Sequence, residues 1–88
     1  MAASLGVALV TLYGKPGCHL CDDARAVVER VRADHPFELR EVDVSLDPVL
    51  LREYGERIPV LALNGEELFD YFVEEAVLVE RLCRVDSS

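Results

Sequence analysis

A change in hydrophobic period near the start of the chain constrains the fold more than any other feature. Val7–Tyr13 is a short apolar run rich in β-branched residues, which is typical of a buried central strand. Gly14–Gly17 then interrupts it with turn-forming residues. The next segment repeats its apolar residues with a helical period, so it predicts a helix over Leu20–Asp34 whose buried face carries Ala24, Val27, Val28 and Val31.

Three further elements follow from alternation and from local stop signals. Phe37–Val44 alternates imperfectly and is best interpreted as a strand. Asp47-Pro48 is typical of a helix N-cap followed by proline at the first helical position, and it predicts a short helix over Val49–Tyr54 that Gly55 closes. The last helix is predicted over Glu74–Arg84, with Leu78, Val79, Leu82 and Cys83 on one side and a frayed end at Val85–Ser88.

A β-hairpin is predicted before that last helix. Its strands are Pro59–Leu63 and Glu67–Phe72, and Asn64-Gly65 between them suits a type I′ turn, because both central residues of that turn have positive φ. The complete order is then β-α-β-α-β-β-α, and its β-α-β opening implies a parallel pair with a right-handed crossover. We therefore expect an α/β fold with a four-stranded mixed sheet flanked by helices.

Length and charge narrow the classes of protein further. The chain has 88 residues, enough for one domain over 1–88, and 51% of them are hydrophobic. Its formal net charge of −8 disfavours nucleic acid or an anionic membrane as a partner. Leu5–Leu12 is apolar but lacks the preceding basic residues and the cleavage site of a signal peptide, and no run approaches the ~20 apolar residues of a membrane span. We expect a soluble cytoplasmic monomer.

The chemistry is expected at Cys18-His19-Leu20-Cys21, a C-x-x-C motif placed where the first helix begins. At a helix N-terminus, unpaired backbone N–H groups and the helix dipole favour a thiolate at Cys18. Cys21 lies on the same side of the first turn, where it can resolve a mixed disulfide formed at Cys18.

Half of a zinc site and a pair of inert core thiols are the alternative interpretations of this motif. A structural zinc site needs four ligands, and the remaining candidates are Cys83, His19 and His35, which lack ligand spacing. The sequence therefore predicts no metal site. The odd cysteine count also disfavours a disulfide-stapled secreted domain and fits reduced thiols. For Cys83 we expect a small buried hydrophobe rather than a regulatory or dimer-forming thiol.

Ile58-Pro59 is the second element of interest. Proline is tolerated at the first residue of a strand, and a cis-proline loop that faces the C-x-x-C is the other interpretation. Such a loop would offer the backbone of Ile58 to an extended substrate. The pattern by itself leaves both interpretations open.

The combined pattern resembles a glutaredoxin-like protein of the thioredoxin superfamily. The resemblance rests on the segment from Tyr13 to Cys21, on Val42-Asp43-Val44, and on Ile58-Pro59-Val60 before an Asn-Gly hairpin. It covers nearly the whole chain in the right order. The resemblance implies a thioredoxin fold, a catalytic Cys18, a resolving Cys21 and a cis Ile58-Pro59 bond.

The chain also departs from the patterns of the superfamily. It has no tryptophan before the motif, and Leu12 stands where thioredoxins bury an acid. The stretch from Leu68 to Phe72 lacks the Gly-Gly element with which glutaredoxins hold glutathione. Lys15 and the proline-loop backbone are the glutathione contacts that match.

Several neighbours of the motif are candidate supporting residues. We expect Lys15 and Arg57 to make the rim of the site locally positive, which favours a thiolate and could attract a substrate. His19 is expected at the exposed helix start, where its protonated form could tune the thiolate. Tyr13 packs either beside the motif or in the core. Asp22 and Asp23 suit the helix dipole, yet their charge should raise the pKa of Cys21.

The sequence thus predicts a dithiol–disulfide oxidoreductase that acts on protein or small-molecule disulfides. No bound cofactor is expected, and the electron donor would be glutathione or a flavin-dependent reductase, with the missing Gly-Gly element favouring the reductase. Two other classes stay open. One is a metal or iron–sulfur carrier that uses the thiolates as ligands, and the other is a non-catalytic binding module.

Overall fold

The computed structural model describes residues 8–87, and it contains the predicted elements in the predicted order. A short 3-10 turn, η1, is the one addition to that order. The elements are β1 (Leu9–Gly14), α2 (His19–Asp34), β2 (Glu38–Asp43), η1 (Val44–Leu46), α3 (Pro48–Tyr54), β3 (Val60–Leu63), β4 (Glu66–Asp70) and α4 (Glu75–Ser87). The first strand was expected from Val7, which lies outside the described residues.

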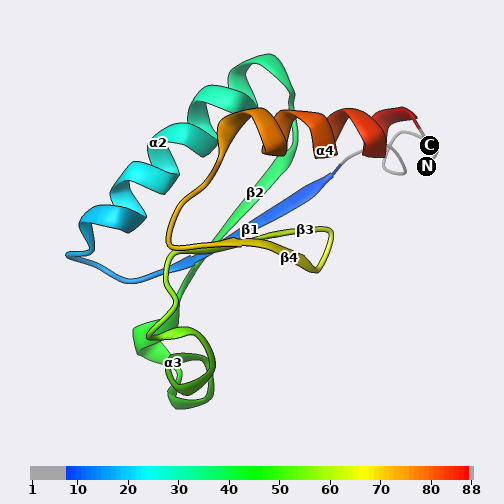
Figure 1. Cartoon of the computed structure of the whole chain (residues 1–88). Coiled ribbons are helices and arrows are strands. Elements are labelled where there is room, and N and C mark those ends of the chain that lie inside the picture. Colours follow the sequence, from blue (N-terminus) through cyan, green and yellow to red (C-terminus); the bar gives the residue numbers. More distant parts are fainter. Residues whose placement is uncertain (1–7, 88) are drawn as a thin grey trace.

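The four strands form one mixed sheet in the order β2-β1-β3-β4. β1 pairs with β2 in parallel and with β3 in antiparallel orientation, and β3 pairs with β4 as a hairpin. The parallel pair and the helix that connects it confirm the predicted β-α-β unit (Figure 1). β1 is therefore an inner strand with partners on both edges, and its Val10 and Leu12 are buried.

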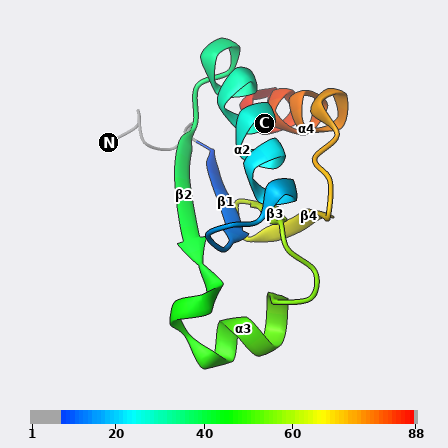
Figure 2. The ribbon, with the colours of Figure 1, turned by 90° about the vertical axis from the view of Figure 1, so that its left-hand side faces the viewer.

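Two helices cover one face of this sheet, and the main core lies between them and the strands. In Figures 1 and 2, α2 and α4 lie above the sheet, whereas α3 lies below it. The predicted buried stripe of α2 is confirmed, with Val27 only partly buried. The core contains Ala8, Val10, Leu12, Ala24, Val28, Val31, Phe37, Leu61, Leu63, Leu78 and Leu82.

Side-chain caps end β2 and start α3. The strand was predicted to continue through Val44 but ends at Asp43, whose carboxylate accepts hydrogen bonds from the N–H and O–H of Ser45. Such local bonds compete with a strand ladder and start the 3-10 turn. The N-cap of α3 is confirmed: Asp47 Oδ1 accepts a 2.8 Å bond from the N–H of Val49.

The hairpin turn is also as predicted. Asn64 and Gly65 have φ values of 52° and 89°, the positive values that a type I′ turn requires. The Asn64 side chain accepts a 2.9 Å hydrogen bond from the N–H of Leu9, which ties the turn to the start of β1. The second hairpin strand, predicted to reach Phe72, ends at Asp70 because the next residue, Tyr71, has a φ of 72°.

Two expectations for the last helix are wrong. The predicted frayed segment continues the helix to Ser87, and the half-buried Val85 packs against the core; Ser88 lies outside the described residues. Cys83 is exposed instead of buried. The buried stripe follows Leu78 and Leu82, and one residue further along a helix turns the side chain by about 100°. Within residues 8–87, no helix is both long and apolar enough to span a bilayer.

The core position of β3 generates a stability prediction. Leu61 is 0% exposed, and replacing a buried leucine by alanine removes contacts and leaves a cavity. We expect Leu61→Ala to lower the free energy of unfolding by about 2–5 kcal/mol in urea denaturation. Leu46→Ala is the matched control, because Leu46 is 81% exposed and should change stability by less than about 0.5 kcal/mol. Equal losses in the two variants would contradict this description of the core.

Candidate active site

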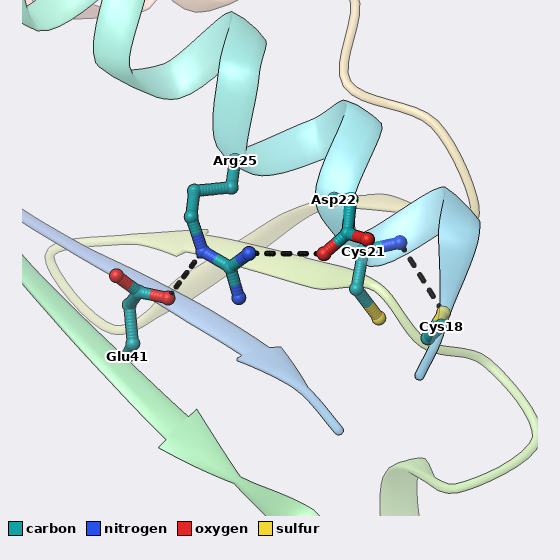
Figure 3. A network of polar contacts seen from close by, with 5 residues as sticks. All are labelled: Cys18, Cys21, Asp22, Arg25 and Glu41. Atoms are coloured by element: carbon teal, nitrogen blue, oxygen red, sulfur yellow. Dashed lines mark hydrogen bonds and ion pairs between the residues drawn. The ribbon is translucent and has the colours of Figure 1, made fainter. Parts of the chain in front are cut away.

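Cys18 is the N-cap residue of α2, at the end of the loop that leaves β1. Its backbone is extended, with φ −98° and ψ 115°, and its Sγ accepts a 3.2 Å hydrogen bond from the N–H of Cys21 (Figure 3). Gly17 just before it has a φ of 79°, a conformation that favours glycine. The sequence therefore places the partly exposed sulfur of Cys18 against the first turn of the helix.

Cys21 is the buried member of the pair, with 1% of its surface exposed. Burial, and after it the hydrogen bond with Cys18, raise the pKa of its thiol to about 11, although a bond from the backbone of Lys15 partly opposes this shift. Asp22 was expected to cause such a shift, but its carboxylate is paired with Arg25 at 3.1 Å. The protonated thiol of Cys21 is thus favoured by desolvation.

Gly14 contributes to the site, although the sequence indicated only a turn at this position. A Cβ atom at this position would lie 2.9 Å from the Sγ of Cys21, which is too close for a real contact. Glycine at the end of β1 therefore lets the strand approach the buried sulfur. The signal available in the sequence was a glycine directly between the strand and the motif.

The Ile58–Pro59 loop packs against the cysteines, as a second buried cluster shows. The cluster consists of Cys21, Val44 and Ile58, with the partly buried Tyr13, Cys18, Leu50 and Tyr54 packed against it. The Ile58–Pro59 peptide bond is cis, as the resemblance implies, and Pro59 is fully buried. The fold thus joins two segments that lie some forty positions apart in the sequence.

Tyr71 forms two hydrogen bonds to this loop, a role that the sequence did not indicate. Its N–H donates a 2.8 Å hydrogen bond to the carbonyl of Pro59, and its hydroxyl donates a 2.9 Å bond to the carbonyl of Glu56. These bonds hold it in the left-handed region, which an aromatic residue rarely adopts. An aromatic residue after a strand carries no distinctive signal, so only the structure identifies this role.

Tyr13 lies beside the motif and begins a stack of side chains. The rings of Tyr13 and Tyr54 are stacked, with 4.3 Å between their centroids. The Arg57 guanidinium lies over the Tyr54 ring, 5.2 Å from its centroid. Arg57 also forms a 3.1 Å ion pair with Glu67 and lies 3.9 Å from Asp70. The positive charge that was expected from Arg57 at the rim is therefore offset by these two carboxylates.

Lys15 and His19 are both exposed near the motif, as expected. Lys15 lies at a pocket of about 350 Å³ between the start of α2 and β2, which Cys21, Arg25 and Glu41 also line. Leu12 contributes an apolar wall to it. Among residues 8–87, no group of three or more histidine, cysteine or acidic side chains is arranged to hold a metal ion.

Comparisons with known proteins place the chain in a family. Residues 9–83 match the family model described as "Glutaredoxin-like domain (DUF836)". The solution NMR structure of protein Ne2328 from Nitrosomonas europaea is 30% identical, covers 85% of this chain and 91% of that one, and has a TM-score of 0.74. An uncharacterized protein of Mycobacterium tuberculosis is 28% identical over 71 residues, which are 75% of this chain and 73% of its relative.

The fold comparison extends to the thioredoxins. A crystal structure of chloroplastic thioredoxin z has a TM-score of 0.76 at 16% identity, over 98% of this chain and 84% of that one. This likeness shows a thioredoxin fold. Within that fold class, the chain belongs to the glutaredoxin-like domain family.

The unequal burial of the cysteines predicts selective alkylation. Cys21 is buried, and at a pKa of about 11 only about 0.1% of a thiol is ionised at pH 8. In a Cys83→Ser variant, which removes the exposed third cysteine, we expect iodoacetamide at pH 8 to modify Cys18 and to spare Cys21. Peptide mass spectrometry measures both sites. Equal modification of the two would contradict the burial described above.

Proposed function

We propose that this protein is a dithiol–disulfide oxidoreductase that reduces disulfides through Cys18 and Cys21. The observation that carries the proposal is the arrangement of the two sulfurs. Cys18 is partly exposed at the N-terminus of α2, and the N–H of the buried Cys21 donates to its sulfur. An accessible sulfur beside a helix N-terminus is suited to nucleophilic attack, and a shielded neighbour is suited to the second step.

The reaction proceeds in two exchanges. The Cys18 thiolate attacks one sulfur of the substrate disulfide, the substrate S–S bond breaks, and the first substrate thiolate leaves and takes a proton. Cys21 then loses its proton and attacks the Cys18 sulfur, which releases the second substrate thiolate. The substrate gains two electrons and two protons, and the protein keeps a Cys18–Cys21 disulfide.

Substrate contacts are assigned to the segments that border Cys18. The Ile58–Pro59 segment is held next to the cysteine pair by packing and by Tyr71, and the backbone of Ile58 offers hydrogen bonds to an extended protein segment. Lys15 supplies a positive charge on the other side of the motif. Arg57, whose guanidinium lies over the Tyr54 ring, is assigned to substrate binding. Tyr13 and His19 are assigned supporting positions beside the motif.

The cycle closes when an external donor reduces the Cys18–Cys21 disulfide. Glutathione and a flavin-dependent reductase are the two donor classes, and neither requires a cofactor bound to this chain. The bulky Tyr71 and Phe72 follow β4, in the stretch that lacks the glutathione-holding Gly-Gly element. We therefore favour the reductase as the electron donor. We also propose that the protein acts as a monomer in the cytoplasm.

Cysteine variants test the proposed reaction. We expect Cys18→Ser to abolish reduction of a model protein disulfide such as insulin, because the nucleophile is gone. Cys21→Ser should accumulate a mixed disulfide at Cys18, detectable as an added mass. Cys83→Ser is the matched control and should keep the activity, because that residue lies on α4 away from the motif. Full turnover by Cys18→Ser would falsify the proposal.

The donor is tested by direct comparison. The oxidised protein is offered either glutathione with glutathione reductase, or a thioredoxin-reductase-type flavoenzyme with its nicotinamide cofactor, and NADPH consumption is followed. We expect faster turnover with the flavoenzyme, because the chain lacks the Gly-Gly element. Brisk turnover with glutathione alone would overturn this preference and leave the two-step reaction intact.

A further inference from the structure

Cys21 faces an obstacle in the second exchange of the proposed function. It must lose a proton to attack Cys18, yet it is buried and its pKa is raised to about 11. β1 contributes Leu12 and Gly14 to the wall of the nearby pocket, and neither residue has a side chain that can accept a proton. Some other feature of the molecule must help to form the Cys21 thiolate.

The pocket beside β2 is where such help can reach Cys21. Its volume of about 350 Å³ has room for several water molecules, and Cys21 forms part of its wall. The buried thiol therefore borders an accessible space on the β2 side. The charged residues around this space are Lys15, Asp22, Arg25, Glu41 and Asp43.

Arg25 is the best-fixed charge in this pocket. Its Nε donates a 2.7 Å hydrogen bond to Glu41 on β2, and its other guanidinium nitrogen pairs at 3.1 Å with Asp22 on its own helix (Figure 3). Glu41 is the direct neighbour of Leu12 in the parallel pair, so it lies on the sheet face that α2 covers. Two carboxylates thus hold the guanidinium at the pocket wall.

We propose that Arg25 is a positioning residue for the resolving step, and that its guanidinium, held by Glu41 and Asp22, stabilises the thiolate that Cys21 forms at the pocket. This inference rests on the proposed function. Cys21 then releases its proton to water in the pocket. Glu41 has two opposed effects, because it fixes the guanidinium in place and also offsets part of its positive charge.

The other groups that face Cys21 do not replace Arg25. From the preceding loop, the Lys15 backbone donates to the sulfur, while the exposed Lys15 side chain adds a second cation at the pocket. Cys18 opposes the thiolate, and Arg25 favours it through its charge.

On β2, Asp43 is bonded to Ser45. From α3, Tyr54 has a pKa raised by burial, so it is neutral at working pH. The Arg25 guanidinium is therefore the charged group at the pocket that is held in place by ion pairs and carries the positive charge that stabilises a thiolate.

The test separates the two exchanges with a neutral aromatic disulfide, dithiodipyridine, in the Cys83→Ser protein. Attack by Cys18 releases one pyridinethione, and attack by Cys21 on the mixed disulfide releases the second. Stopped-flow absorbance records both rates between pH 5 and pH 10. The probe carries no charge, so a change at Arg25 acts on the protein thiol and not on the reagent.

Substitutions on the two sides of the ion pair should act in opposite directions. We expect Arg25→Gln to move the pH profile of the second release upward by about half a unit, which is about a threefold slower release at neutral pH. Arg25→Lys should restore part of the rate. Glu41→Gln should move the profile downward, because the amide oxygen of glutamine still accepts the bond from the Arg25 Nε while the neutralising negative charge is gone. The rate of the first release should stay unchanged in all three variants.

A second ion pair between the same helix and another element provides the control. Arg30 pairs with Glu75 at 3.0 Å, and neither residue lines the pocket, so Arg30→Gln should leave both releases unchanged.

The inference is overturned if Arg25→Gln and Glu41→Gln shift the second release in the same direction, if neither shifts it, or if both releases slow alike. A Cys83→Ser protein that gives no second release would overturn the proposed function together with this inference. A normal profile in the Cys83→Ser protein, with insensitive Arg25 and Glu41 variants, would overturn the inference alone.

Discussion

The pairing of β1 on both of its edges is the constraint from which the site follows. The motif loop leaves the carboxyl end of β1, where Tyr13 has Val42 of β2 on one side and Val60 of β3 on the other. β3 begins just after the proline loop, so this register brings Ile58 and Pro59 to the cysteines. β2 ends beside the same point and brings Glu41 and Asp43 to the pocket.

The two cysteines differ in burial because of how each packs at the end of β1. Gly14 allows β1 to approach the Cys21 sulfur, and the second buried cluster packs around this residue, which borders the pocket on the β2 side. Cys18 precedes the helix and keeps part of its surface exposed. Burial of Cys21 and partial exposure of Cys18 thus give two residues of the same chemical type different environments. Two of the positive side chains near the site, Arg25 and Arg57, are each bonded to carboxylates, which are plentiful in a chain of net charge −8.

Capping and turn patterns in the sequence led to correct predictions, whereas long-range pairings were not visible in it. Asp47-Pro48 and Asn64-Gly65 predicted a helix start and a turn correctly, because each depends on side chains within three residues. The offset of the Arg57 charge could not be predicted, because its partner Glu67 comes from the next strand of the hairpin. Cys83 was misjudged because one position along a helix separates a buried face from an exposed one.

The sequence by itself determined the order of elements, the identity of the cysteine pair and the position of Cys18 at a helix start. These depend on hydrophobic period and on short-range capping, which a few neighbouring residues specify. The tertiary structure alone decided the close approach of Gly14 to the Cys21 sulfur, the two bonds from Tyr71 to the proline loop, and the ion pair of Arg25 on α2 with Glu41 on β2. Each of these requires strand register and helix packing, because the atoms that meet belong to separate segments of the chain.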